Sequence, residues 1–314
     1  MNRALLSLGL ITGLAACGDG QPFTFGQTVD PGTDDSGSTN SIDETIARNV
    51  DLVGTPSGGS LSVQITGLDG PAIPVSFSRN TALDVPGYEA YSYQDDPLDR
   101  FFVAMVETSA DGAMLGSAVI SGGQFNEYYG GVYYERVQVY SAGSGQVSYA
   151  GTYVGLTNIN DAGDQLLPVD PGTDPSIVSG QPYIITGDIF LNANFDEATP
   201  VINGEIYNRA VLDTDVIAAN GNQPTPDGEI LDLALTQGVI DADGNFSGAV
   251  EMPDRTTVGT YAGQFGGTGG SSVAGGLFLD GDWWDAVENE NEIGLFVLTQ
   301  CGEPGDDPIC DQVN

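Results

Sequence analysis

The sequence has 314 residues, with 44 Asp and Glu against seven Arg, no Lys and no His, and a formal net charge of -37. Without His and Lys, it lacks the residues for a Ser-His-Asp triad, an imidazole metal site, a lysine Schiff base and a P-loop. Its acidic excess also disfavours nucleic acid and anionic lipid headgroups as partners, since both attract clustered Lys and Arg. We therefore expect a protein that is not an enzyme and does not bind nucleic acid.

Residues 1–16 predict a signal peptide. Arg3 precedes an apolar run that ends at Ile11, and Ala15 and Ala16 stand directly before Cys17. A positive start, a short apolar stretch and small residues at a cleavage point are typical of secretion signals, and the run is too short to span a bilayer. The cysteine resembles the lipobox of bacterial lipoproteins, which implies that Cys17 carries fatty acyl chains such as palmitate. The alternative is an ordinary cleaved signal.

Residues 17–46 predict the lipidated Cys17 and a disordered tether. The segment is rich in Gly, Asp, Ser, Thr and Pro, and its few apolar residues cannot offset the entropy lost on ordering. Gly18 separates Cys17 from Asp19, so the lipoprotein pattern for inner-membrane retention, an Asp directly after the cysteine, is absent. We expect a lipid anchor in the outer membrane and exposure at the cell surface.

Residues 47–140 predict a β-rich region, because short apolar runs alternate with Gly, Asp, Asn and Pro. The candidate strands are Leu61–Thr66, Ile73–Ser78, Tyr88–Tyr93, Phe101–Thr108, Ala113–Ile120 and Val132–Tyr140.

Residues 145–300 contain eight further candidate strands. Eight antiparallel strands in up-and-down order close into a barrel, which removes exposed sheet edges. We predict an all-β fold in which such a barrel follows a smaller β-rich domain. The candidates are Gln146–Leu156, Tyr183–Phe195, Val201–Val211, Glu229–Ile240, Asn245–Glu251, Val258–Phe265, Ser272–Leu279 and Glu292–Thr299.

Three linked elements lie between residues 183 and 278. The first is a strand that ends at Phe195, the second is a Gly turn at Gly244, and the third is a pair of strands. Together they resemble the C-terminal barrel of the transferrin-binding protein B type, a family of Gram-negative surface lipoproteins. The positions that match the family's glycine and aromatic steps are Gly263, Phe265 and Gly266, then Gly275, Gly276 and Phe278.

The resemblance implies that residues 47–140 form a handle domain beside the barrel. It also implies a surface lipoprotein that binds a protein or solute ligand, with an outer-membrane transporter as a further partner to test. Phe265 and Phe278 are expected in the core, because an eight-stranded barrel holds mostly side chains. A transmembrane porin is a rival, although the lipobox and the charges within the strands favour a soluble barrel.

Two aromatic clusters are candidate partner contacts, because Tyr, Trp and Arg are enriched in binding hot spots. Tyr128 and Tyr129 lie near Arg136, in a stretch that equally suits a half-buried strand. Trp283 and Trp284 are adjacent, so in an extended strand they point to opposite faces and one is expected to be exposed.

Two acidic segments are candidate sites for Ca2+, because oxygen side chains surround that ion. The first holds Asp241, Asp243 and Asn245, which equally suit a hairpin turn. The second is a predicted loop that holds Asn158, Asn160, Asp161 and Asp164.

The remaining cysteines, Cys301 and Cys310, predict a disulfide that closes the tail, residues 301–314, because an even pair in an exported chain forms a bridge. The sequence thus indicates an outer-membrane-anchored, ligand-binding lipoprotein. The main alternative is a structural or adhesive acidic surface protein without a discrete ligand site. A hydrolase with an Asp or Glu pair is weaker, since 44 acids place some pairs together by chance.

Overall fold

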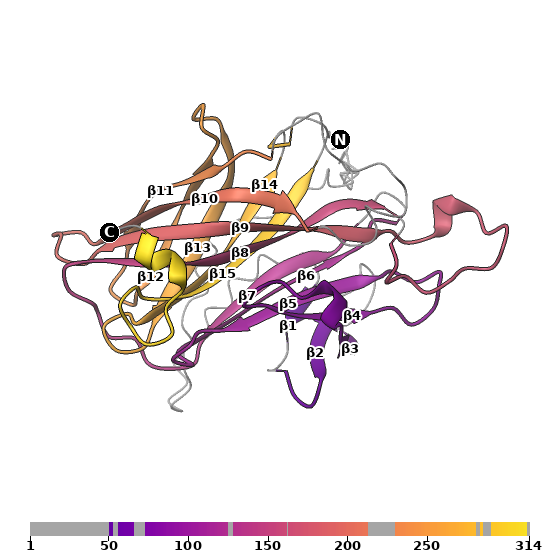
Figure 1. The fold of residues 1–314 in the computed structure, drawn as a ribbon, viewed down its shortest axis with the longest axis horizontal. Helices are drawn as coiled ribbons and strands as arrows, with labels where there is room; N and C mark the ends of the chain where they lie inside the picture. The colour runs from indigo at the N-terminus through magenta and orange to yellow at the C-terminus, as the bar shows by residue number, and fades with distance from the viewer. Residues whose placement is uncertain are drawn as a thin grey trace, which may run out of the picture.

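A computed structural model describes residues 50–52, 56–65, 73–124, 128–161, 163–212, 230–280, 283–284 and 290–312. Within these residues the protein is all-β, with three short 3-10 helices and two sheets that lie side by side (Figure 1). No helix in this part of the chain has the length and apolar character to cross a membrane. The predicted signal peptide and tether, including Cys17, lie outside the described residues.

The first sheet is an antiparallel meander of seven strands in sequence order. It curls on itself, so that β1 approaches β7, and it encloses a small core that includes Leu61, Phe77 and Tyr91. The strands are β1 (Val50–Leu52), β2 (Ser60–Ile65), β3 (Ile73–Arg79), β4 (Glu89–Tyr93), β5 (Phe102–Thr108), β6 (Met114–Ser121) and β7 (Gly130–Arg136).

The second sheet is the predicted barrel, closed by eight antiparallel strands. Consecutive strands pair throughout, and β15 returns to pair with β8. This confirms the up-and-down barrel. The strands are β8 (Gln146–Asp161), β9 (Gln181–Asn194), β10 (Val201–Val211), β11 (Leu233–Ile240), β12 (Asn245–Glu251), β13 (Thr257–Gly266), β14 (Ser272–Asp280) and β15 (Asn291–Thr299).

Aliphatic and aromatic side chains fill the barrel, and aromatic rings gather around Phe265. The ring of Phe265 is fully buried, and its centroid lies 5.2 Å from that of Phe246, 5.3 Å from Phe195 and 5.5 Å from Tyr149. Rings at these separations contribute favourable contacts beyond their buried area. Phe265 is therefore a core residue, as predicted.

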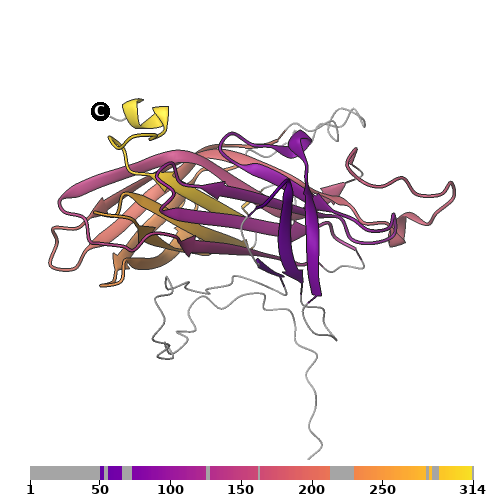
Figure 2. The same cartoon turned by 90° about the horizontal axis from the view of Figure 1, so that it is seen from below.

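The curled sheet lies against one side of the barrel (Figure 2), and the two share a hydrophobic core. Met105 and Val132 of the sheet pack in the same cluster as Leu295 and Phe278 of the barrel wall. Gly116 permits this approach, because a β-carbon there would collide with Leu295 and Val297. Phe278 is thus buried as predicted, between the two sheets rather than inside the barrel.

Three predicted strand boundaries are wrong by four or five residues. The strand expected to reach Tyr140 ends at Arg136, the one expected from Glu229 begins at Leu233, and the one expected to end at Leu156 continues to Asp161. Arg136 ends its strand because it turns into the barrel wall, where its Nε donates a hydrogen bond to the Phe265 carbonyl at 2.7 Å. Strand β1 was not predicted.

Candidate functional site

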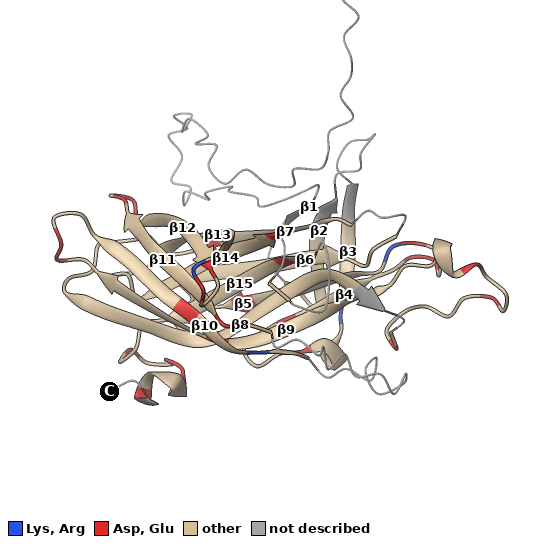
Figure 3. Ribbon diagram, turned by 90° about the horizontal axis from the view of Figure 1, so that it is seen from above, with Lys and Arg blue, Asp and Glu red and all other residues tan. Residues whose placement is uncertain are grey.

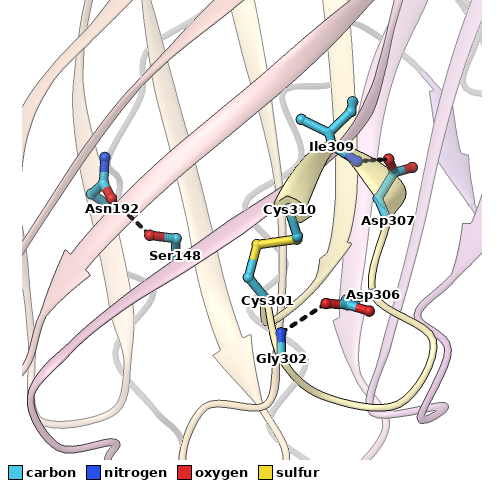
Figure 4. The surroundings of a disulfide bond; sticks show 8 residues. All are labelled: Ser148, Asn192, Cys301, Gly302, Asp306, Asp307, Ile309 and Cys310. Atoms are coloured by element: carbon cyan, nitrogen blue, oxygen red, sulfur yellow. Dashed lines mark hydrogen bonds between the residues drawn. A yellow bond between two sulfur atoms is a disulfide. The ribbon is translucent and has the colours of Figure 1, made fainter. Parts of the chain in front are cut away.

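A groove of about 810 Å³ lies on the outer wall of the barrel. Strands β8 to β11 form its floor, and the tail after β15 forms its rim. Figure 4 shows Ser148 and Asn192 on neighbouring strands beside the disulfide that closes this tail. Cavities of this size are typical of small-molecule sites.

The strand register places a row of polar side chains along the floor. Ser148 of β8 lies opposite Asn192 of β9, and Asn192 lies opposite Asn203 of β10. The Ser148 hydroxyl and the Oδ1 atom of Asn192 are 2.8 Å apart and form a hydrogen bond. In the next row, Gln146 lies opposite Asn194.

Alternation along each strand explains why these side chains face outward. Asn192 is exposed, whereas its neighbours Leu191 and Ala193 are buried. In β10, Asn203 is likewise exposed beside the buried Ile202. Because successive strand residues point to opposite faces, the barrel core directs the amides into the groove.

The tail is fixed against the barrel as the groove's rim. Cys301 and Cys310 form the predicted disulfide, with a Cα–Cα distance of 5.4 Å. The Cys301 amide donates a hydrogen bond to the Ser148 carbonyl at 2.8 Å, and Cys310 packs against Ala150 and Phe190.

The charges that line the groove are acidic. Glu197, Asp306 and Asp311 contribute carboxylates, and no Arg is among the described lining residues. The Asn194 side-chain amide donates to Glu197 at 3.0 Å, and the Gly302 amide donates to Asp306 at 2.7 Å. Figure 3 shows the same imbalance over the molecule, with many more acidic than basic positions. The groove therefore disfavours anions.

A second polar cluster is buried inside one end of the barrel. Arg209 forms an ion pair with Glu292, whose other oxygen accepts a hydrogen bond from Tyr153. Both charged side chains are fully buried. Burial and, after it, the charge of Glu292 raise the pKa of the Tyr153 hydroxyl well above its ordinary value.

Both tryptophans belong to this end of the barrel. Trp283 is 0% exposed and Trp284 is 1% exposed, so the expectation that one of them faces solvent is wrong. The Arg209 guanidinium lies 5.0 Å from the Trp283 ring centroid. Within the described residues, neither indole N–H has a hydrogen-bond partner, and the same holds for the Oε2 atom of Glu290.

Of the other predicted partner contacts, Tyr128 and Arg136 lie at the seam between sheet and barrel, and Tyr129 packs against the core of the curled sheet. Arg136 is buried and donates to the Asp243 carbonyl at 2.7 Å, so it is not available to an external partner. Tyr128 is half-buried and donates to Asn291 at 2.7 Å. Tyr129 is half-buried beneath Arg100, whose guanidinium lies 4.8 Å from the ring centroid.

The first proposed Ca2+ segment is a hairpin turn between β11 and β12. The Oδ1 atom of Asp241 accepts hydrogen bonds from the amides of Asp243 and Asn245, at 2.9 and 2.8 Å. Gly244 completes the turn with a φ of +80°. The carboxylate thus serves the turn itself.

The second segment is not the loop that was expected, because β8 continues to Asp161. Strand pairing of Asn160 with Pro182 carries β8 that far, and Asn158 accepts a hydrogen bond from the Asn291 amide. Asp164 is exposed. Within the described ranges, no three Asp, Glu or Cys side chains gather as a metal site would require, and Ca2+ binding stays a prediction.

The sequence matches no protein-family model and no curated protein. Among solved structures, it is similar to a double mutant of the vaccine antigen transferrin-binding protein B from Haemophilus parasuis Hp5. That match has 11% identity and a TM-score of 0.41, and covers 81% of this chain and 45% of the other.

Intact Ap-TbpB, with N and C lobes, matches at 9% identity and a TM-score of 0.39 over 78% of this chain and 53% of that one. A single mutant of the Haemophilus parasuis protein matches at 11% identity and a TM-score of 0.34, over 78% and 51%. The chain thus spans about half the length of these proteins. At this level of similarity the matches identify no ligand and no function.

Sequence reasoning missed the groove's amides. The stretch Leu191-Asn192-Ala193-Asn194 carries the signal, an alternation of apolar and amide residues at the end of a strand. From the sequence alone, this stretch predicts a strand and does not mark a site. The buried charges Arg209 and Glu292 were also missed, because their pairing joins residues 83 positions apart.

Proposed function

We propose that this protein is an outer-membrane-anchored lipoprotein that binds a protein or solute ligand without catalysis. The observation that carries the proposal is the groove between the barrel wall and the disulfide-closed tail, which combines exposed polar side chains with a fixed rim. A site held by rigid strands keeps its geometry before the ligand arrives, which lowers the entropic cost of binding.

The anchor part of the proposal rests on the sequence. The run that ends in Ala15-Ala16-Cys17 supports lipidation of Cys17, and the polar segment after it supports a tether between membrane and barrel. Since fatty acyl chains hold such a protein at the membrane, Cys17→Ser is expected to release the protein into the soluble fraction. Protease treatment of intact cells, followed by immunoblotting, tests surface exposure.

A binding role agrees with the composition. The full sequence contains neither His nor Lys, so acid–base and nucleophilic chemistry would depend on carboxylates, Tyr, Ser and Thr alone. A membrane transporter is a natural partner for a surface binding protein, and we keep it as part of the proposal.

The alternative is a structural or adhesive surface protein with no discrete ligand site. The charge of -37 favours it, because strong like charge keeps a surface hydrated and opposes aggregation. Saturable binding of one ligand in the groove would displace this alternative.

The test of the proposed function is capture from native cells. Tagged full-length protein, purified from membranes, is exposed to growth medium and to surface extracts of the same cells. We expect the wild type to retain a defined component that the double variant Asn192→Ala/Asn203→Ala loses. The control is Glu205→Ala, which lies on the outward face of β10 outside the groove. Retention of nothing, or equal retention by all three proteins, would count against the proposal.

A further inference from the structure

The floor of the groove is made of neutral groups that both donate and accept hydrogen bonds. Five of its six polar side chains, Gln146, Ser148, Asn192, Asn194 and Asn203, lie in the paired rows of β8 to β10. The sixth is Gln237 of β11. An amide offers two N–H donors and one carbonyl acceptor, and a hydroxyl offers both roles on one atom. The floor thus complements a ligand whose own groups do both.

Part of this capacity is not used within the protein. The Oδ1 atom of Asn192 accepts from Ser148, but no described residue accepts from its Nδ2 atom. Asn203 and Gln237 are exposed and make no side-chain hydrogen bond with the described residues. These groups face solvent and are available to a ligand.

Charge selects against anions and does not require a cation. An anionic ligand would meet Glu197, Asp306 and Asp311 with no Arg among the described lining residues. The floor itself is neutral, so it recognises a ligand through hydrogen bonds and not through charge. The electrostatics disfavour an anion, and the amide row favours a ligand rich in groups that both donate and accept hydrogen bonds.

On the tail side of the groove, Phe190 and Cys310 are buried against each other, so the surface offered to a ligand is mainly polar. The hydroxyl groups of a sugar each donate and accept hydrogen bonds, so a sugar suits a row of amides and a hydroxyl. Neighbouring strands lie about 4.8 Å apart, so the polar side chains of the row are separated by about the width of a sugar ring.

We propose that this groove is a binding site for an uncharged oligosaccharide, held through hydrogen bonds to the amide row of β8 to β11. This inference rests on the proposed function and specifies its ligand class. The volume of about 810 Å³ accommodates a short segment of a glycan chain.

The experiment is a titration of the full-length protein, in detergent, with linear trisaccharides of glucose, galactose, mannose and N-acetylglucosamine. Calorimetry or ligand-observed NMR gives the dissociation constants. We expect at least one of these sugars to bind, and Asn192→Ala/Asn203→Ala to weaken that binding about tenfold or more, because several hydrogen bonds are lost together. Glu205→Ala is expected to bind as the wild type does. All the substituted side chains are exposed, so equal urea midpoints would verify the fold.

Three results would overturn the inference. They are the absence of binding by every neutral trisaccharide, equal binding by the groove variant, and preferential binding of a sulfated or uronic-acid trisaccharide. If the sugars fail while native-cell capture still depends on Asn192 and Asn203, the ligand class is wrong and the proposed function stands. If both experiments are negative, the proposed function and the oligosaccharide inference both fail.

Discussion

Gly155 and Gly294 lie directly opposite each other on β8 and β15, and other side chains occupy the space that their β-carbons would fill. At Gly155 that side chain is Glu292, and at Gly294 it is Tyr153. The glycine pair thus makes room for the carboxylate that pairs with Arg209 inside the barrel. The two glycines therefore permit a buried ion pair in a barrel otherwise filled by aliphatic and aromatic side chains.

Gly155→Ala is expected to lower the free energy of unfolding by about 1–3 kcal/mol, because the added methyl group would overlap the Glu292 carboxylate. Urea unfolding measures the effect. Ala210→Ser, at an exposed position of β10, is the control and should leave the midpoint close to that of the wild type. Equal stability of Gly155→Ala and wild type would contradict the packing described above.

Glu292→Gln is expected to lower the free energy of unfolding by about 3–5 kcal/mol, since it leaves the Arg209 guanidinium buried without its counter-charge. The double variant Arg209→Met/Glu292→Leu removes both charges. It should be more stable than Glu292→Gln, because no unpaired ion remains buried. A double variant less stable than Glu292→Gln would indicate that the loss of stability comes from packing and not from an unpaired charge.

Glu107 predicts a pH dependence. Burial, and after it the charge of Asp307, raise the pKa of the Glu107 carboxyl well above its ordinary value of 4.5. The folded state therefore binds this proton more tightly than the unfolded chain does. Its contribution to stability is complete below pH 4.5 and is lost as the pH rises through the raised pKa.

Glu107→Gln keeps the neutral form at every pH. We expect the wild type to lose more stability than this variant between pH 5 and pH 8, measured as the shift of the urea midpoint. Repulsion among the many other carboxylates is present in both proteins, so it cancels in the comparison. Parallel curves for the two proteins would contradict a raised pKa at Glu107.

Reduction of the disulfide is expected to loosen the tail and leave the barrel folded. The bridge closes a loop with a sequence separation of nine, which in chain-entropy terms corresponds to about 2–3 kcal/mol. Hydrogen exchange of Cys301→Ser/Cys310→Ser should therefore increase at residues 301–312, and ligand capture should weaken. Increased exchange throughout β8 to β15 would instead make the bridge essential for the whole barrel.

Strand positions were predictable where the apolar alternation is regular. The expected ranges Val201–Val211 and Asn245–Glu251 agree with β10 and β12, since inward residues such as Ile202 and Phe246 recur beside exposed polar ones. The alternation of successive residues between the two faces of a strand did not apply to the tryptophans. Trp283 lies in a bend and Trp284 forms an isolated bridge with Ile230, so both reach the same core.

The groove was not predictable, because it depends on contacts between distant segments. The alternation around Asn192 indicates an outward amide, but only the docking of the tail beside β8 makes a rim above it. Arg136 shows the same limit. Its place near Tyr128 and Tyr129 in the sequence suggested a partner contact, whereas the packing of the sheet on the barrel directs it to the Phe265 carbonyl.

Hydrogen exchange on the full-length protein, with and without the component that it captures from native cells, would locate the binding surface. We expect protection at residues 146–148, 192–194 and 201–203 and in the tail, 300–311, which line the groove. Protection confined to the curled sheet, or no protection in the presence of saturating ligand, would contradict binding in the groove.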